Sequence, residues 1–198
     1  MEDYLMTSKT IKIEDNFLEQ EKFDEIQLML NPMADPNHDI TTLNFAWYFR
    51  YRYYADPYDD RDKDKGELDQ FQFTHTFYDD GVPQSPHMQQ LQCFMELLQP
   101  IAIFSIRGNL LTRLPNIVEN PFHTDMSFLQ EKRLKQWTTS IFYVNTNNGY
   151  TIFEDGTKVE SVANRMLTFP ANMRHTGTTC TDQQIRIVIN FNYYKSTT

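Results

Sequence analysis

The sequence IRIVINFNYY, from Ile185 to Tyr194, alternates between two kinds of side chain and therefore predicts a β-strand. Its odd positions form a continuous apolar face, made of Ile185, Ile187, Ile189 and Phe191. Its even positions carry a cation and two amides around one valine, in the order Arg186, Val188, Asn190 and Asn192. Because successive side chains of a strand point to opposite faces, one face packs on a core and the other is polar. Such a polar face is usually solvent-facing, but a wet cavity inside the fold would also account for it.

Two histidines and an aspartate upstream of this strand favour the cavity. His123 and Asp125 flank a single residue, and His175 lies eleven residues before Arg186. Residues i and i+2 of a strand point to the same side, so His123 and Asp125 can reach one metal ion if the chain is extended there. Two imidazoles and one carboxylate are the ligands of a facial site for non-heme Fe(II). The His-x-Asp pair alone is weak evidence, because a partly buried His bonded to its neighbouring Asp would look the same.

Taken in order, these motifs resemble the double-stranded β-helix core of Fe(II)/2-oxoglutarate-dependent dioxygenases. The order is His-x-Asp, Tyr-x-Asn, Gly-x-Thr-x-Phe, Asn-Arg-Met-Leu-Thr-Phe-Pro, His and Arg-Ile-Val-Ile-Asn-Phe-Asn-Tyr, which begin at His123, Tyr143, Gly149, Asn164, His175 and Arg186. The chain is most similar to the prolyl-4-hydroxylase-like branch, and particularly to hydroxylases encoded by marine bacteriophages. The segment from Asn145 to Arg165 is the part most similar to the phage proteins, which also carry an Arg and an Asn like Arg107 and Asn109.

The resemblance implies a role for each motif. His123, Asp125 and His175 would hold Fe(II), with the co-substrate 2-oxoglutarate filling two of the remaining positions and O2 the third. Arg186 would pair with the distal carboxylate of 2-oxoglutarate, since its planar fork suits a bidentate pair. Tyr143 would donate its phenol to the same carboxylate.

Asn190 and Asn192 share the strand face of Arg186, so they would line the pocket as contacts to the cofactor or the substrate. The implied reaction hydroxylates an unactivated C–H bond and releases succinate and CO2, with ascorbate as a candidate reductant. A prolyl residue in a peptide or protein is the first candidate substrate, and a free amino acid, another small molecule or another protein side chain stays open.

Two other classes of protein would use the same ligands. A non-enzymatic cupin-like barrel would bind the metal for structure or sensing, but a closed structural site has no need of a buried cation such as Arg186. A zinc hydrolase would also need a general base near the metal, and no further Glu or His falls inside the motifs.

Composition bounds the class of protein further. With 198 residues, of which 40% are hydrophobic, we expect a single domain over residues 1–198. The net charge of −9 predicts no nucleic-acid partner, because phosphate backbones require a basic surface. Cys93 and Cys180 are too few for a disulfide framework, which favours free thiols. Without a secretory signal or a long apolar run we expect no membrane partner and a cytoplasmic location, in the host cytoplasm if a phage encodes the protein.

The expected fold is mainly β with flanking helices: a double-stranded β-helix core over residues 106–195, with two N-terminal helices packed on one sheet. Residues 1–105 would supply those helices and a lid. One helix is predicted from Leu18 to Leu30, and a second begins at Ser85 and Pro86, where Ser can cap and Pro fits the first turn.

Three further expectations concern the N-terminal half. The aromatic run from Phe45 to Tyr54 predicts a strand that packs in the core, with an exposed substrate platform as the minority interpretation. The acidic run from Asp56 to Asp69 predicts a mobile loop and a candidate lid. His75, set among aromatic residues, is predicted to be either packed or exposed, without a metal role.

Overall fold

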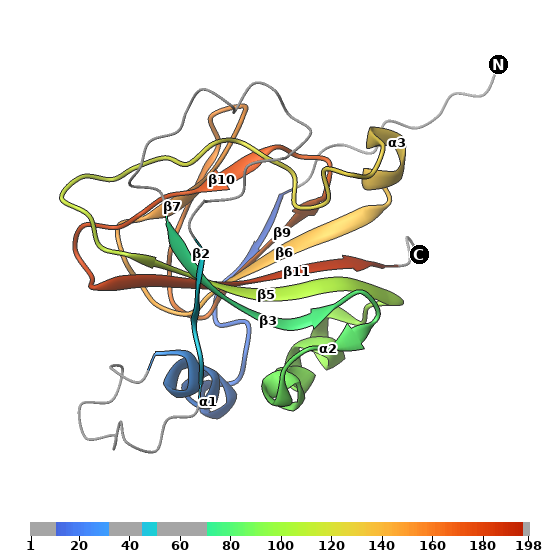
Figure 1. The fold of residues 1–198 in the computed structure, drawn as a ribbon, viewed down its shortest axis with the longest axis horizontal. Helices are drawn as coiled ribbons and strands as arrows, with labels where there is room; N and C mark the ends of the chain where they lie inside the picture. Colours follow the sequence, from blue (N-terminus) through green and yellow to red (C-terminus); the bar gives the residue numbers. More distant parts are fainter. Residues whose placement is uncertain (1–10, 32–44, 51–70, 196–198) are drawn as a thin grey trace.

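A computed structural model describes residues 11–31, 45–50 and 71–195 of the protein (Figure 1). The described N-terminal half contains, in order, β1 (Lys12–Glu14), α1 (Gln20–Leu30), β2 (Tyr48–Arg50), β3 (Gln72–Asp79), β4 (Val82–Pro83), the 3-10 helix η4 (Pro86–Leu91) and α2 (Gln92–Leu98). It is followed by β5 (Ala102–Thr112), α3 (Glu131–Leu134), β6 (Trp137–Tyr143), β7 (Tyr150–Phe153), β8 (Lys158–Glu160), β9 (Arg165–Pro170), β10 (His175–Gly177) and β11 (Ile185–Tyr194). The predicted mainly β architecture is confirmed.

The strands form two antiparallel sheets. The larger sheet has the strand order β1-β9-β6-β11-β5-β3-β2, with β4 paired to β3, and the smaller sheet has the order β10-β7-β8. β5 runs unbroken from Ala102 to Thr112 between β3 and β11, so the boundary predicted between residues 105 and 106 falls inside one strand. The N-terminal strands β1, β2 and β3 therefore extend the same sheet that the C-terminal strands build.

The two longer helices cover one face of the larger sheet, and the smaller sheet lies on the other side (Figure 1). The odd positions of β11 pack with the buried stripes of α1 and α2 in one core cluster, which includes Phe23, Ile26, Leu30, Phe94, Leu98, Ile187, Ile189 and Phe191. The apolar face predicted for this strand is thus the helix-covered face. Its even positions point the other way, toward the space between the sheets.

The first helix begins two residues later than predicted. Leu18 is held outside the helix by the side chain of Asn164, whose Oδ1 accepts the Leu18 N–H at 2.9 Å and whose Nδ2 donates to the Leu18 carbonyl at 2.8 Å. The second predicted start is correct, since the Ser85 hydroxyl accepts the N–H of His87 as an N-cap. Hydrogen bonds between residues distant in the sequence therefore determine where the helix begins, and the local sequence pattern predicted this start too early.

The aromatic segment divides between core and surface. Phe45 and Trp47 pack against the core cluster, as predicted, whereas Tyr48 and Phe49 are 59% and 57% exposed. The core-packing prediction is wrong for these two because β2 is a three-residue strand at the edge of the sheet. Residues 51–54 of that prediction, and the acidic run predicted as a mobile lid, lie outside the described residues.

His75 is packed, which is one of the two alternatives predicted for it. It is 5% exposed, its Nδ1 donates to the carbonyl of Ala46 at 2.6 Å, and its Nε2 accepts from the Ser85 hydroxyl at 2.7 Å. Burial lowers the pKa of this imidazole. Over the described ranges, none of the helices combines the length and the apolar character that crossing a membrane demands.

Candidate metal centre and adjoining cavities

His123 and His175 face each other across an antiparallel pair. His175 opens β10, and His123 forms an isolated bridge with it in which each N–H donates to the other's carbonyl at 3.0 Å. Residues directly opposite in such a pair present their side chains on the same face, and the two imidazole rings lie 5.1 Å apart. The extended conformation predicted for the His-x-Asp motif is limited to this bridge, because Asp125 already lies in the following turn.

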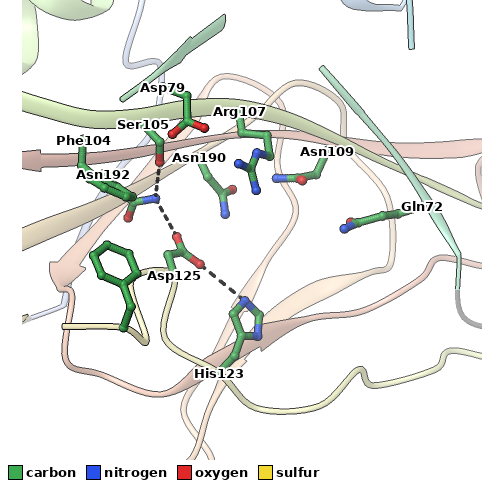
Figure 2. Close-up of a pocket in the computed structure, with 11 residues that line it drawn as sticks. Gln72, Asp79, Phe104, Ser105, Arg107, Asn109, His123, Asp125, Asn190 and Asn192 are labelled. Atoms are coloured by element: carbon green, nitrogen blue, oxygen red, sulfur yellow. Dashed lines mark hydrogen bonds and ion pairs between the residues drawn. The ribbon is translucent and has the colours of Figure 1, made fainter. Parts of the chain in front are cut away.

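Asp125 completes a cluster of three metal-ligand side chains. One ligand atom of each of His123, Asp125 and His175 lies within 4.8 Å of the others. The Oδ1 of Asp125 is 3.4 Å from Nε2 of His123 and 3.7 Å from Nε2 of His175 (Figure 2 shows the first contact). The structure therefore brings together the three residues predicted to hold Fe(II).

The backbone fixes how both imidazoles present their nitrogens. The Nδ1 of His123 lies 3.1 Å from the carbonyl of Pro121, and the Nδ1 of His175 lies 3.1 Å from the carbonyl of Met173. A carbonyl can only accept, so each Nδ1 carries a proton and each Nε2 faces Asp125, where it can donate to the carboxylate when protonated or bind a metal through its lone pair when not. This orientation is the one that metal-bound histidines usually have.

Burial sets the charge state of the cluster. Desolvation lowers the pKa of His175 to about 4, against the opposite effect of Asp125, so this imidazole is neutral at pH 7 and able to bind a metal. Desolvation alone would raise the pKa of Asp125. The hydrogen bond from His123, the nearby imidazoles and the amide of Asn192 together hold that pKa below its usual range, so Asp125 is a carboxylate.

Asn192 anchors Asp125 to the larger sheet. Its Nδ2 donates to Oδ2 of Asp125 at 3.1 Å and to the hydroxyl of Ser105 at 3.4 Å, while its Oδ1 accepts from Thr139 at 2.9 Å (Figure 2 shows the two donated bonds). The amide has its orientation fixed on both sides, and it leaves the other oxygen of Asp125 facing the histidines. Asn192 therefore positions a ligand of the candidate metal centre.

Replacing Asn192 with Ala should weaken Fe(II) binding roughly 10- to 100-fold, because Asp125 loses the partner that orients it. The measurement is an anaerobic Fe(II) titration of the metal-free protein, with thermal melting to check folding. Asn148→Ala, the same change at an exposed loop residue, is the matched control. An unaltered Fe(II) affinity in folded Asn192→Ala would show that Asp125 needs no such anchor.

The larger of two cavities beside the cluster has a volume of about 250 Å³. Polar side chains from β3, β5 and β11 converge on it, with two phenylalanines at its side, and its lining beyond His123 and Asp125 is Gln72, Asp79, Phe104, Ser105, Arg107, Asn109, Phe128, Asn190 and Asn192 (Figure 2). From this lining, the sequence had singled out Asn190 and Asn192 as pocket residues. Arg107 and Asn109 could also have been predicted as pocket residues, because they occupy alternate positions of an extended segment.

The second cavity is narrow, about 20 Å³, and is lined by both histidines and by Arg186. Asn109 and Asn190 line both cavities, and Thr151 lies near Arg186 in the narrow one. Arg186 is 3% exposed, and its Nε donates to the hydroxyl of Ser161 at 2.9 Å. A guanidinium so deeply buried in the lining of a cavity is suited to bind an anion there.

Tyr143 lies behind this cavity. Its phenol is fully buried and donates to the hydroxyl of Thr151 at 2.7 Å, and its ring centroid is 5.7 Å from the guanidinium carbon of Arg186. Burial raises the pKa of the phenol. The side chain that reaches the cavity from here is Thr151, so a direct bond from Tyr143 to a bound carboxylate stays a prediction.

Gly149 makes room for Arg186. A Cβ at this position would lie 2.8 Å from Cδ of Arg186, 2.8 Å from Oδ1 of Asn147 and 2.8 Å from the backbone oxygen of Thr179. Gly149→Ala should therefore destabilise the protein by about 1–3 kcal/mol, since the backbone contact cannot relax by rotating a side chain. Denaturant unfolding measures the change, and a variant as stable as the unmodified protein would contradict this tight packing.

Comparison with known proteins identifies the fold. No family model matches the sequence, and no curated protein matches it. Among solved structures, it resembles an oxidoreductase of the 2OG-Fe(II) oxygenase family from Burkholderia pseudomallei, with a TM-score of 0.60, 10% identity, and coverage of 93% of this chain and 84% of that one.

Two further solved structures share this fold. One is a prolyl hydroxylase from Trichoplax adhaerens in complex with a hypoxia inducible factor peptide, with a TM-score of 0.55, 14% identity, and coverage of 94% and 84%. The other is HygX from Streptomyces hygroscopicus with nickel and 2-oxoglutarate bound, with a TM-score of 0.53, 10% identity, and coverage of 98% and 86%. The double-stranded β-helix predicted from the sequence is therefore the fold of this protein.

Proposed function

We propose that this protein is an Fe(II)- and 2-oxoglutarate-dependent oxygenase that hydroxylates an unactivated C–H bond and releases succinate and CO2. The observation that carries the proposal is the cluster of His123, Asp125 and His175, together with a narrow cavity that both histidines and the buried Arg186 line. The similar fold of 2OG-Fe(II) oxygenases supports it.

The residues of the site fit these groups. Two imidazole nitrogens and a carboxylate suit Fe(II) and leave coordination positions open. Bound iron would supply the redox chemistry that couples decarboxylation of 2-oxoglutarate to hydroxylation. The protein would contribute orientation, through the backbone bonds to His123 and His175 and the amide bond to Asp125.

Arg186 would bind the distal carboxylate of 2-oxoglutarate. Burial strengthens such a charge pair by excluding water, and the bonds to Ser161 and Thr151 hold the guanidinium in place beforehand. Asn190, between the two cavities, is placed to contact either the co-substrate or the substrate. Tyr143 would act on the same carboxylate, directly or through Thr151. Ascorbate stays a prediction, as does the resemblance to bacteriophage proteins.

A prolyl group is the first candidate for the substrate, since a prolyl hydroxylase with a bound peptide shares the fold. The larger cavity would receive it, because His123 and Asp125 line this cavity and Arg186 does not. Phe104 and Phe128, whose rings lie 5.2 Å apart, would provide an apolar wall for the aliphatic part.

The test is formation of succinate from 2-oxoglutarate by purified protein with Fe(II) and O2, without added substrate. Slow turnover that requires both Fe(II) and O2 is expected. Folded protein that binds Fe(II) but neither binds 2-oxoglutarate nor forms succinate would favour the non-enzymatic metal-binding barrel instead.

A further inference from the structure

Two of the cations on the cavity-lining face of the larger sheet, Arg186 and Arg107, line different cavities. The pairing of β11 with β5 sets Arg186 opposite Leu111 and Asn190 opposite Arg107. Arg107 and Leu111 are four residues apart on β5, which corresponds to about 13 Å of strand. Arg186 accordingly lines the narrow cavity and Arg107 the larger one. If 2-oxoglutarate binds to Arg186, then Arg107 provides a second binding site for an anionic group.

Arg107 is available to such an anion. Its side chain is half-buried and forms no hydrogen bond or ion pair with any residue in the described ranges, although a guanidinium has five N–H donors. The amides of Asn109 and Asn190 point into the same space as Arg107 (Figure 2). Oδ1 of Asn190 is buried and, among the described residues, has no hydrogen-bond partner, so the cavity also holds an unused acceptor. Buried polar groups normally have hydrogen-bond partners. A ligand with an anionic group and N–H donors would provide partners for Arg107 and for Oδ1 of Asn190.

Asp79 supplies the opposite charge in the same cavity. It pairs with Ser105 in the register between β3 and β5, two residues before Arg107 on β5. Its carboxylate is half-buried, and within the described part of the protein it makes no hydrogen bond or ion pair, with Arg107 or otherwise. A cation and an anion that do not neutralise each other within one partly buried cavity favour a ligand that carries both charges.

We propose that the larger cavity binds the substrate as a free α-amino acid, with its carboxylate on Arg107 and its ammonium group toward Asp79. This inference rests on the proposed function and names its substrate class. One oxygen atom of O2 enters a C–H bond of the amino acid's aliphatic part to give C–OH, and the other enters succinate as 2-oxoglutarate loses CO2. The C–H bond and the decarboxylation each supply two electrons, which together reduce O2.

A residue inside a peptide fits the cavity less well. Its carboxyl and amino groups are neutral amides, so binding would leave Arg107 and Asp79 without counter-charges as the cavity loses water. Leaving a charged group desolvated and unpaired is costly, which favours the zwitterion over the peptide. The prolyl group of the proposed function would accordingly enter as free proline, one member of the amino-acid class.

The first experiment compares matched compounds. Each common amino acid, proline included, is tested as the free acid, the carboxamide and the N-acetyl derivative, together with proline-containing peptides. The readouts are succinate release above the substrate-free rate and a product heavier by one oxygen atom. We expect a free acid to stimulate succinate release, and neither its carboxamide nor its N-acetyl form to do so. Equal stimulation by blocked forms or peptides overturns the proposal, and so does the absence of stimulation by any free amino acid.

The second experiment measures binding of the stimulating amino acid by calorimetry, in protein loaded with Zn(II) and 2-oxoglutarate so that no turnover occurs. Arg107→Gln should weaken binding roughly 10- to 100-fold, as expected for losing hydrogen bonds to a charged group. It should also bind the acid and the carboxamide about equally. Arg113→Gln, the same change at an exposed residue just after β5, should bind like the unmodified protein.

Asp79→Asn should likewise abolish the preference for a free ammonium group, with exposed Asp80→Asn as its control. A fall in 2-oxoglutarate affinity in Arg107→Gln, with amino-acid selectivity unchanged, would assign Arg107 to the co-substrate and overturn the proposal. Failure of the proposed function has its own readout, because the protein would then form no succinate in the absence of substrate. In that case, calorimetry of amino-acid binding to protein loaded with Zn(II) alone still tests the cavity.

Discussion

Replacing Arg186 with Gln weakens 2-oxoglutarate binding about 30-fold to several thousandfold. A surface arginine would contribute about 0–1 kcal/mol to such an interaction, but Arg186 is 3% exposed in the lining of a cavity. Removing the cation leaves the distal carboxylate buried without its partner, at a cost of about 2–5 kcal/mol. The conversion of about 1.4 kcal/mol per tenfold change gives the stated range.

The measurement is the dissociation constant of 2-oxoglutarate for the variant and the unmodified protein. Fe(II) affinity should change little, because Arg186 is not a ligand. Arg186 also bonds Ser161 and packs against Gly149, so Arg186→Lys and thermal melting separate loss of the charge pair from loss of folding. A folded Arg186→Gln with near-normal 2-oxoglutarate affinity would remove the main reason for preferring an oxygenase over a plain metal-binding barrel.

Replacing His175 with Ala abolishes the visible charge-transfer band that we expect from anaerobic Fe(II) and 2-oxoglutarate bound together. Two of the three proposed metal ligands remain in the variant, and the imidazole that is neutral at pH 7 is the one removed. Because metal affinity depends on ligand number and geometry, the complex should no longer form at concentrations that saturate the unmodified protein.

Absorption spectroscopy under anaerobic conditions provides the readout. His175 also packs against Phe169, with the two ring centroids 4.7 Å apart, so circular dichroism must show that the variant folds. His87→Ala, which removes a histidine from η4 on the helix-covered side, is the control and should keep the band. An undiminished band in His175→Ala would remove this residue from the ligand set.

The amino-acid sequence by itself determined the two faces of β11. The alternation from Ile185 to Tyr194 follows from strand geometry, which is local, so it correctly separated the face under the helices from the face that lines the cavities. The helical stripes were predictable for the same reason. The spacing of His123 and Asp125 and the later His175 pointed to one cluster, because two imidazoles and a carboxylate are the ligands of a facial Fe(II) site.

Tertiary structure alone decided what surrounds that cluster. Gln72 and Asp79 line the same cavity as Arg107 only because β3 pairs with β5, and the register between segments distant in the sequence depends on how the whole core packs. The pairing of strands also exposes Tyr48 on an edge strand and directs the phenol of Tyr143 to Thr151. Local periodicity fixes which way a side chain points from its strand. Only the pairing of strands fixes which other side chains that side chain contacts. In this protein, the pairing forms the cavity in which the substrate is proposed to bind.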